Sequence, residues 1–585
     1  MYNKKETPNP RGRQLMRKRR QIAAAVIVPV LFFFCVELFF RLTWREQSPR
    51  DDLSAYLKLP IPRRCYIKEE VTFGRASYRA CQDGFPCSPE RIEMPKQENV
   101  RRIIIVGESI ALPFKGELFS SLLAGLVSDK KVEVINCAKP AYDSHRVCYV
   151  IEEMLSYSPD VIVVMSGNNE FYNSQPFDSL LAKAERLLKK LSLAYAWMSS
   201  PRGISSRGFA PLNAQQRLEN YSRNLRFMVR TAKSRKVPIA LCTAPINIRD
   251  CPPLVQPPND ERYWRAKLIG EAGNRGKAIE LFATYLKRSP GDAMAHFNLA
   301  KMYDAQGDFE KARYHYLKSA YFSYGKLHHA CAESNEIVRA VCQQEGAVLV
   351  DIEWLFSQIA PQGMPGYNMF IDSCHWHGQY NKEVMSLVAS AIGHPQKPAR
   401  VQGAITLPET RSIQHPPQEG LNKIKEAAAL VIKWRYSPNE RAIALFEFAR
   451  QIVPETLLRL KENQDEIRQQ LAADYWLKNR AEMLEDRWGD ILAHVGECYR
   501  RQGFFREAED YFKSALAFDS QDHLARLGRA LLLATLGGRR DALAELEYVD
   551  RGDVGEGVIN AYREYILSKS EGKNIPEELV SGNSN

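Results

Sequence analysis

Short runs of consecutive apolar residues alternate with stretches of helical periodicity through the middle of the chain. The apolar runs lie at residues 102–106, 132–136, 161–165, 238–243 and 348–351, and the helical stretches at 114–128, 144–157, 213–235 and 327–345. Strands that are apolar throughout are typical of a parallel sheet covered by helices on both faces. Such sheets bind ligands beyond the carboxyl ends of their strands. The pattern therefore predicts an α/β domain whose site is built from the residues that follow each strand.

A different pattern interrupts this alternation at residues 260–325, between the fourth and fifth apolar runs. Ala278 and Ala312 lie 34 residues apart, and each is followed four positions later by an aromatic residue, Phe282 and Tyr316. The spacing resembles the tetratricopeptide repeat, a helix-turn-helix unit of 34 residues. Unrelated amphipathic helices are the alternative, but they would not be expected to share this register.

The same small and aromatic positions recur near the C-terminus, where we expect further helical repeats over residues 418–570. Such repeats stack only against neighbours, and about three are needed for stability. The inserted repeat is therefore expected to lean on the α/β domain or on the C-terminal repeats. The resemblance also implies a protein partner bound through the repeats. Tyr303, Gly307 and Ala312 correspond to Tyr499, Gly503 and Ala508. Ala508 is matched in turn by Ala542. Ala278, Phe282 and Pro290 correspond to Ala442, Phe446 and Pro454.

An apolar run of 19 residues, 22–40, stands near the N-terminus and is broken by Pro29 and Glu37. Its length is enough to cross a bilayer as a helix. Because its N-terminal flank is basic, the pattern predicts a transmembrane helix at 22–42 with the bulk of the chain outside the cytoplasm, anchored in the inner membrane. A cleaved signal peptide is the alternative, but no small-residue cleavage site follows.

The formal charge of +12 is concentrated in this tail, where residues 1–21 hold eight basic residues and one acid. The rest of the chain carries only +5, which is too dilute for a surface that tracks phosphates. No nucleic-acid partner is expected. The predicted organisation is a basic cytoplasmic tail (1–21), the membrane helix, a stalk (43–100), the α/β domain (101–392), a proline-rich linker (393–417), the C-terminal repeats and a disordered tail (571–585).

Twelve cysteines are spread along the chain without a C-x-x-C pair, so zinc ribbons and thioredoxin-like chemistry have no support. Outside a reducing cytosol, disulfides could form among Cys65, Cys81 and Cys87, or between Cys242 and Cys251. No Gly-x-Gly-x-x-Gly follows an apolar run, and "GNRGK" lacks the ending of a phosphate loop. Neither a cofactor nor a metal is expected.

Polar residues follow the predicted strands. Gly107-Glu108-Ser109 follows the first, "NCAKPAYDS" the second and "SGNNEFYN" the third, while "FIDSCHWHGQYN" lies downstream of the fifth. Together they offer a hydroxyl, an amide, a carboxylate and an imidazole at one sheet edge. A serine hydroxyl needs an adjacent base to become nucleophilic, and acyl transfer needs donors aimed at the developing oxyanion. These residue types therefore indicate nucleophilic acyl transfer.

Over residues 101–250 and 326–392 the pattern resembles the SGNH (GDSL) hydrolases, esterases and acylhydrolases on a flavodoxin-like α/β fold. The resemblance implies Ser109 as nucleophile, His375 as base and Asp372 as its orienting carboxylate. It implies an oxyanion hole formed by the Ser109 and Ala141 N–H groups and the Asn169 side chain, with Gly107 and Gly167 contacting substrate. "GNNEFYN" further resembles a membrane-anchored, repeat-bearing branch of these proteins.

Two positions depart from the family pattern. Glu108 replaces the usual aspartate and keeps its charge. Ala141 stands where the family has a glycine, so the N–H survives but a glycine-only conformation would be harder to hold.

Simpler interpretations of the site residues also exist. Asn169 could have a purely structural role, as the cap of a helix or in stabilising a turn. His375 and His377 could suggest a metal, although no third ligand of matching spacing is evident. Cys374 is expected to be buried or paired.

Three functions fit this sequence. The first is an esterase that acts on an ester-bearing or acetylated glycan or lipid outside the cytoplasm. The second is an O-acyltransferase or deacetylase that modifies envelope polysaccharide. The third is a protein-interaction scaffold with an inactive SGNH domain, since fold alone does not establish activity.

Overall fold

The computed structural model describes the greater part of the chain. The described residues are 32, 35–36, 38, 64–72, 75–81, 87–114, 117–124, 131–170, 176–180, 183–184, 187–188, 213–324, 329–393, 417–433, 438–474 and 477–569. The basic tail at 1–21, nearly all of the linker at 393–417 and the C-terminal tail at 571–585 lie outside them.

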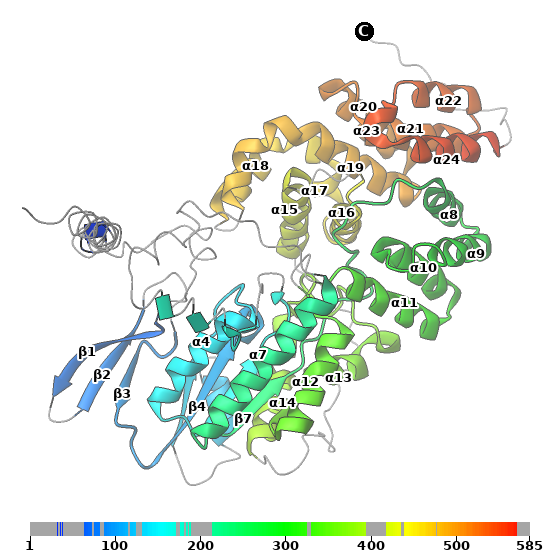
Figure 1. Ribbon diagram of the computed structural model, residues 1–585. Helices are drawn as coiled ribbons and strands as arrows, with labels where there is room; N and C mark the ends of the chain where they lie inside the picture. Colours follow the sequence, from blue (N-terminus) through cyan, green and yellow to red (C-terminus); the bar gives the residue numbers. More distant parts are fainter. Residues whose placement is uncertain are drawn as a thin grey trace, which may run out of the picture.

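Five parallel strands form the central sheet in the order β5-β4-β6-β7-β8 (Figure 1). Their bounds are β4 Val100–Gly107, β5 Lys131–Asn136, β6 Val161–Met165, β7 Ile239–Cys242 and β8 Val348–Val350. Every neighbouring pair is parallel, which confirms the predicted sheet. The order is that of a flavodoxin-like sheet, in which the crevice for a ligand lies where the strand order reverses. That point lies beside the carboxyl end of β4.

Alternate residues of the strands enter two hydrophobic cores, because successive side chains of a strand point to opposite faces. Ile104 and Val106 pack in one core with α4, α7 and α12, whereas Ile103 and Ile105 pack in the other with α3, α13 and α14. Burying each of these side chains contributes roughly 1.5–3 kcal/mol. The helices are α3 Glu117–Ala124, α4 Ser144–Met154, α7 Ala214–Ser234, α12 Ala332–Glu345, α13 Ile352–Ile359 and α14 Asn381–Gly393.

Four helices lie between β7 and α12, in the stretch where the sequence predicts an inserted repeat. They are α8 Glu261–Glu271, α9 Arg275–Leu286, α10 Ala293–Gln306 and α11 Phe309–Phe322. Side chains of Asn274, Asp292 and Asp308 accept a backbone N–H at the start of α9, α10 and α11, which satisfies donors that a helix start leaves unpaired. Gly307 ends α10 in the left-handed conformation, with φ of 82°.

The described residues of the C-terminal region form helices joined by short turns, and these helices continue the array begun by the inserted ones (Figure 1). Leu531, Ile559 and Tyr562 share a hydrophobic core with Tyr263 and Trp264 of α8. Its α-helices are α15 Pro417–Lys433, α16 Glu440–Ile452, α17 Pro454–Leu458, α18 Gln464–Ala473, α19 Trp488–Arg501, α20 Phe505–Phe518, α21 His523–Thr535, α22 Arg539–Glu547, α23 Arg551–Val554 and α24 Glu556–Leu567.

Ion pairs also join the inserted helices to the C-terminal ones. Arg500 and Arg501 of α19 lie 2.8 Å and 3.6 Å from Glu271 of α8. Lys267 of α8 adds a contact of 3.3 Å to Glu440. Lys267 and Glu440 are both buried, so removing one of them would leave a buried charge without this partner, at a cost of about 3–5 kcal/mol. Other residues of the insertion, such as Phe297 and Tyr316, pack in a core of the parallel sheet, so the insertion leans on both neighbours.

A small antiparallel sheet precedes the parallel one, in a stretch where the sequence shows no clear period and predicts a stalk. It is formed by β1 Tyr66–Thr72, β2 Arg75–Ala80 and β3 Arg91–Met94, in that order. Tyr66 and Ile92 share the hydrophobic core that contains α4. The Glu153 carboxylate of α4 accepts hydrogen bonds from the backbone N–H groups of Cys65 and Tyr66. The small sheet is therefore packed onto the α/β domain.

The transmembrane helix predicted at 22–42 requires correction. Within the part of the chain that the structure describes, no helix has both the length and the apolar composition to cross a bilayer. The longest described helix, α7, has 21 residues but carries six charged side chains. The finding also contradicts the single-pass location in the inner membrane that was inferred from this segment. Four residues of the segment are described, all helical: Phe32, Cys35, Val36 and Leu38.

Candidate active site

Ser109 lies where the polypeptide leaves β4 and is the first residue of a short 3-10 helix, Ser109–Ala111. The turn depends on Gly107, whose φ is 144°. A Cβ at Gly107 would lie 1.9 Å from the Met165 carbonyl oxygen of β6. The glycine is thus required by the close approach of two backbones. Gly167 also has a positive φ, 142°, and faces the Tyr221 hydroxyl.

His375 connects Ser109 to Asp372 through two short contacts. Its Nε2 lies 2.7 Å from the Ser109 Oγ, and its Nδ1 lies 2.7 Å from the Asp372 Oδ2. Ser109 is 266 positions away in the chain, and the three side chains are partly exposed. The fold therefore brings a hydroxyl, an imidazole and a carboxylate into one linear arrangement at the sheet edge.

The Asp372 carboxylate is held by its own loop. Its Oδ1 accepts the backbone N–H groups of Cys374 at 2.9 Å and His375 at 2.8 Å. Asn247, which follows β7, secures the loop by donating its backbone N–H to the Ser373 carbonyl and its side-chain amide to the Asp372 carbonyl. These bonds fix the imidazole orientation through its carboxylate.

The electrostatic coupling of the pair follows from its geometry. Burial would raise the pKa of Asp372, but His375 and the two backbone donors outweigh it and hold that pKa well below its ordinary value. Burial would likewise lower the pKa of His375, yet the Asp372 charge outweighs it and raises that pKa well above its ordinary value. The carboxylate thus stabilises an imidazolium at this position.

Glu108, which the sequence treats as a conservative replacement, is fully buried and organises the neighbouring loop. Its carboxylate accepts the Asn168 backbone N–H, the Asn168 side-chain amide at 2.7 Å and the Asn169 side-chain amide at 2.7 Å. Burial raises the pKa of Glu108 to about 8, although the bonds from Asn168 favour the ionised form. No sequence pattern indicates this role, because burial of an acid beside a nucleophile cannot be read from local periodicity.

Asn169 and Ala141, the other residues assigned to the oxyanion hole, lie on adjoining loops. Besides its bond to Glu108, the Asn169 amide donates a longer hydrogen bond of 3.3 Å to the carbonyl of Tyr142. Ala141 is buried and has a φ of 58°, the left-handed conformation that favours glycine. Alanine therefore occupies a conformation that favours glycine.

Ala141→Gly is expected to remove the strain of this conformation, which costs about 1–2 kcal/mol for a residue with a Cβ. Ala138→Gly is a matched control, because Ala138 is buried in the same loop without a positive φ. In chemical denaturation, the Ala141 variant should be about 1 kcal/mol more stable than the Ala138 variant. Equal loss of stability in the two variants would contradict this account of the loop.

The sequence also allows other roles for His377 and Cys374, and their contacts in the structure bear on these roles. The His377 Nε2 contacts the Tyr367 carbonyl at 3.0 Å, whereas His375 faces Ser109, so the two imidazoles do not converge on one point. Cys374 is buried, and burial raises the pKa of its thiol to about 11. It is therefore held as a thiol. Asp372, Cys374 and His375 also form a group of close ligand atoms, in which His375 contacts both Asp372 and Ser109.

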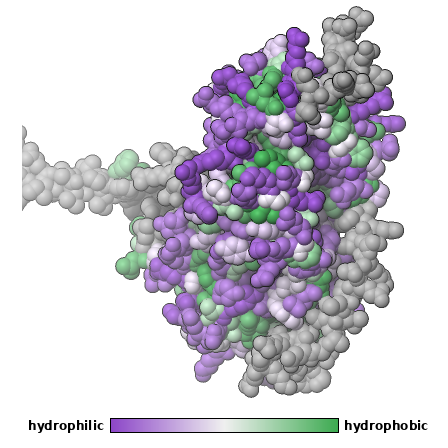
Figure 2. Space-filling view, turned by 90° about the vertical axis from the view of Figure 1, so that its right-hand side faces the viewer, coloured by the Kyte–Doolittle hydropathy of each residue, from purple (hydrophilic) through white to green (hydrophobic). Residues whose placement is uncertain are grey.

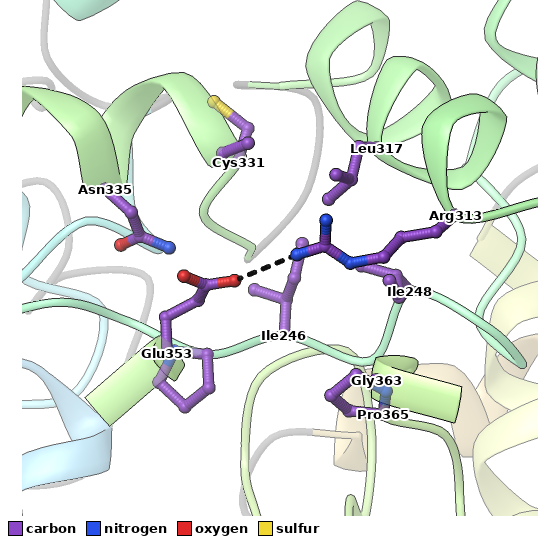
Figure 3. Close-up of a pocket in the computed structure, with 11 residues that line it drawn as sticks. Ile246, Ile248, Arg313, Leu317, Cys331, Asn335, Glu353, Gly363 and Pro365 are labelled. Atoms are coloured by element: carbon purple, nitrogen blue, oxygen red, sulfur yellow. Dashed lines mark ion pairs between the residues drawn. The ribbon is translucent and has the colours of Figure 1, made fainter. Parts of the chain in front are cut away.

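A narrow pocket beneath the inserted repeat contains none of the predicted site residues (Figure 3). Ile246 follows β7, Leu317 comes from α11, and Asn335 of α12 is hydrogen-bonded to the backbone of Ala244. An ion pair between Arg313 and Glu353, at 3.9 Å, links α11 to α13 across it (Figure 3). The pocket lies at the contact between the insertion and the sheet.

Comparison with known proteins finds similarity in two parts of the chain. A tetratricopeptide repeat family model matches residues 265–326, which confirms the repeat predicted in this stretch. No curated protein matches the chain. One similar solved structure is a putative GDSL-like lipase from Parabacteroides merdae, with 12% identity and a TM-score of 0.27, and the match covers 51% of this chain and 96% of that chain. A second is a GDSL-like lipase from Bacteroides thetaiotaomicron, with 10% identity and a TM-score of 0.24, and the match covers 50% of this chain and 88% of that chain. A third is TesA, with 14% identity and a TM-score of 0.23, and the match covers 51% of this chain and 99% of that chain.

The resemblance to GDSL-like hydrolases with tetratricopeptide-like repeats is thus found again by comparison. The TM-scores of these matches, 0.23 to 0.27, lie far below 0.5.

Proposed function

We propose that this protein is a serine hydrolase that cleaves ester bonds through an acyl-enzyme. The observation that carries the proposal is the pair of 2.7 Å contacts that join the Ser109 hydroxyl, the His375 imidazole and the Asp372 carboxylate. His375 accepts the proton as Ser109 attacks the acyl carbonyl, and Asp372 stabilises the imidazolium that forms. His375 then returns the proton to the leaving alcohol, and water hydrolyses the acyl-enzyme by the same steps in reverse order.

Stabilisation of the oxyanion is assigned to the N–H groups of Ser109 and Ala141 and to the Asn169 amide. Asn169 keeps its 2.7 Å bond to Glu108 and exchanges the longer bond to the Tyr142 carbonyl for the oxyanion. Because neutral carbonyl acceptors are weaker than an oxyanion, this exchange favours the transition state over the resting site. Glu108 is then a positioning residue for Asn169.

Labelling with a fluorophosphonate tests the proposal directly, because this reagent phosphonylates activated serine hydroxyls and needs no knowledge of the substrate. We expect stoichiometric labelling of the full chain, mapped to Ser109 by peptide mass spectrometry. Labelling should fall when His375 is replaced by alanine. A well-folded protein that stays unlabelled would contradict the proposal and favour a non-catalytic scaffold.

The repeats support a second activity, protein binding, beside hydrolysis. Tetratricopeptide repeats commonly bind peptides or proteins, and the family match covers residues 265–326. Figure 2 shows mainly hydrophilic residues on one face of the molecule, with the hydrophobic ones among the described residues in small separate groups. A partner for that face would be recognised mainly through polar and charged contacts. The two activities are compatible, since the proposed active site and the repeats are built from different residues.

A further inference from the structure

Three cysteines from separate segments meet where the small antiparallel sheet packs on the parallel one. Cys65 precedes β1, Cys87 precedes the bridge between Ser88 and Asn136, and Cys137 follows β5. Their Sγ atoms all lie within 4.8 Å of one another. The three residues are 1%, 5% and 0% exposed. In Figure 1 the small sheet lies beside β4 and α4.

Each of the three segments is fixed by backbone hydrogen bonds. Cys65 donates its N–H to the Glu153 carboxylate, and Cys137 donates its N–H to the Ile105 carbonyl. Cys87 adjoins Ser88, which exchanges two backbone hydrogen bonds with Asn136. The three thiols are therefore brought together by the fold, in a site that is preorganised before any ligand arrives.

The donor atoms of the cluster are soft. The Met154 Sδ lies 3.3 Å from the Cys137 Sγ and adds a thioether to the three thiols. Among the described residues, no further His, Cys, Asp or Glu belongs to this group of close ligand atoms. Thiolate and thioether ligands select d10 ions such as Cu⁺ and Zn²⁺.

We propose that Cys65, Cys87 and Cys137 bind one thiophilic d10 metal ion as three thiolates, with their protons released to solvent. The ion joins β1 and its neighbours to the loop that follows β5. That loop continues through Lys139, whose N–H donates to the Gly107 carbonyl, to Ala141. The metal would thus stabilise a structural junction beside the active site, and its binding does not depend on hydrolysis.

A disulfide within this cluster is the alternative to a metal ion. A disulfide would use only two of the three cysteines, whereas a metal ion would bind all three. Joining two of the three sulfurs requires an oxidant that removes two electrons, and it leaves the third thiol buried without its partners. None of the twelve cysteines is in a disulfide in this structure. The odd number of thiols and the adjacent thioether favour a metal over a disulfide.

The experiment uses the full chain, purified under reducing conditions, stripped of metal and then titrated with Cu⁺ or Zn²⁺ in separate arms. We expect one equivalent of one of these ions to remain bound, measured by elemental analysis and native mass spectrometry. Loading should raise the thermal midpoint by several degrees, because the ion binds only the folded junction. The two arms identify which d10 ion the site prefers.

Single Cys65→Ser, Cys87→Ser and Cys137→Ser variants should each lose the bound ion, whereas Cys342→Ser, at a buried thiol outside the cluster, should keep it. Native mass spectrometry of the unsubstituted chain provides a direct test if a variant fails to fold. Failure of both ions to bind that chain at one equivalent would overturn the proposal. Retention of the ion by all three cluster variants would overturn it too.

Discussion

Replacing Ser109 with alanine is expected to abolish ester hydrolysis while the protein stays folded. The substitution removes the Oγ that lies 2.7 Å from the His375 Nε2, and with it the atom that would carry the acyl group. Loss of an activated serine lowers kcat by about 10⁴–10⁶-fold in enzymes of this chemistry. The measurement is kcat/KM on activated esters of several acyl lengths, with circular dichroism to confirm the fold.

Ser121→Ala is the matched control for this variant. Ser121 is exposed on α3, and its hydroxyl donates only to the Leu118 carbonyl of its own helix. Turnover should be unchanged in that variant. If Ser109→Ala hydrolyses the esters at the rate of the unsubstituted protein, the assignment of the nucleophile is wrong.

The parallel sheet could be predicted from the sequence because burial on both faces leaves a strong local signal. All five residues of β6 are apolar, and all five are buried. The small antiparallel sheet leaves no such signal. In β2, Arg75–Ala80, polar and apolar residues are mixed and only Ala80 is buried, so its position is determined by pairing with β1 and β3.

The candidate site could be predicted in its residues but not in its contacts. Ser109, Asp372 and His375 follow elements that local periodicity identifies, and parallel topology places those ends at one edge. The Glu108 carboxylate accepts hydrogen bonds from Asn168 and Asn169, 60 and 61 positions away, and local patterns contain no information on such distant pairing. For the same reason, the clustering of Cys65, Cys87 and Cys137 could not be predicted from the sequence.

For the repeats too, the sequence predicts contacts within one unit but not contacts between helices that are far apart in the chain. Their 34-residue register specifies how two helices of one unit approach each other, and it predicts helices in both regions. It does not specify that α8 meets α24, or that Arg500 pairs with Glu271. At the N-terminus, by contrast, the apolar run at 22–40 predicts a membrane helix over 22–42 that finds no support among the described residues.

Asp372→Asn is expected to lower kcat/KM by about 10²–10⁴-fold and to shift the acid limb of its pH profile to lower pH. The Asp372 charge raises the pKa of His375, so the neutral base that Ser109 requires appears only as the pH rises through this raised value. An amide has no charge and stabilises the imidazolium less. His375 in the variant therefore loses its proton at lower pH, while its weaker orientation lowers the plateau.

The measurement is kcat/KM across the acid and neutral range, with Asp510→Asn as control. Asp510 is an exposed carboxylate on α20 that pairs with Lys461 in the C-terminal repeats. Its replacement should change neither the limb nor the plateau, because an exposed ion pair contributes about 1 kcal/mol or less. A lower plateau with an unshifted limb would mean that Asp372 only holds the loop. An unchanged plateau would mean that another group orients His375. Either result would contradict the coupling of Asp372 to His375 described above.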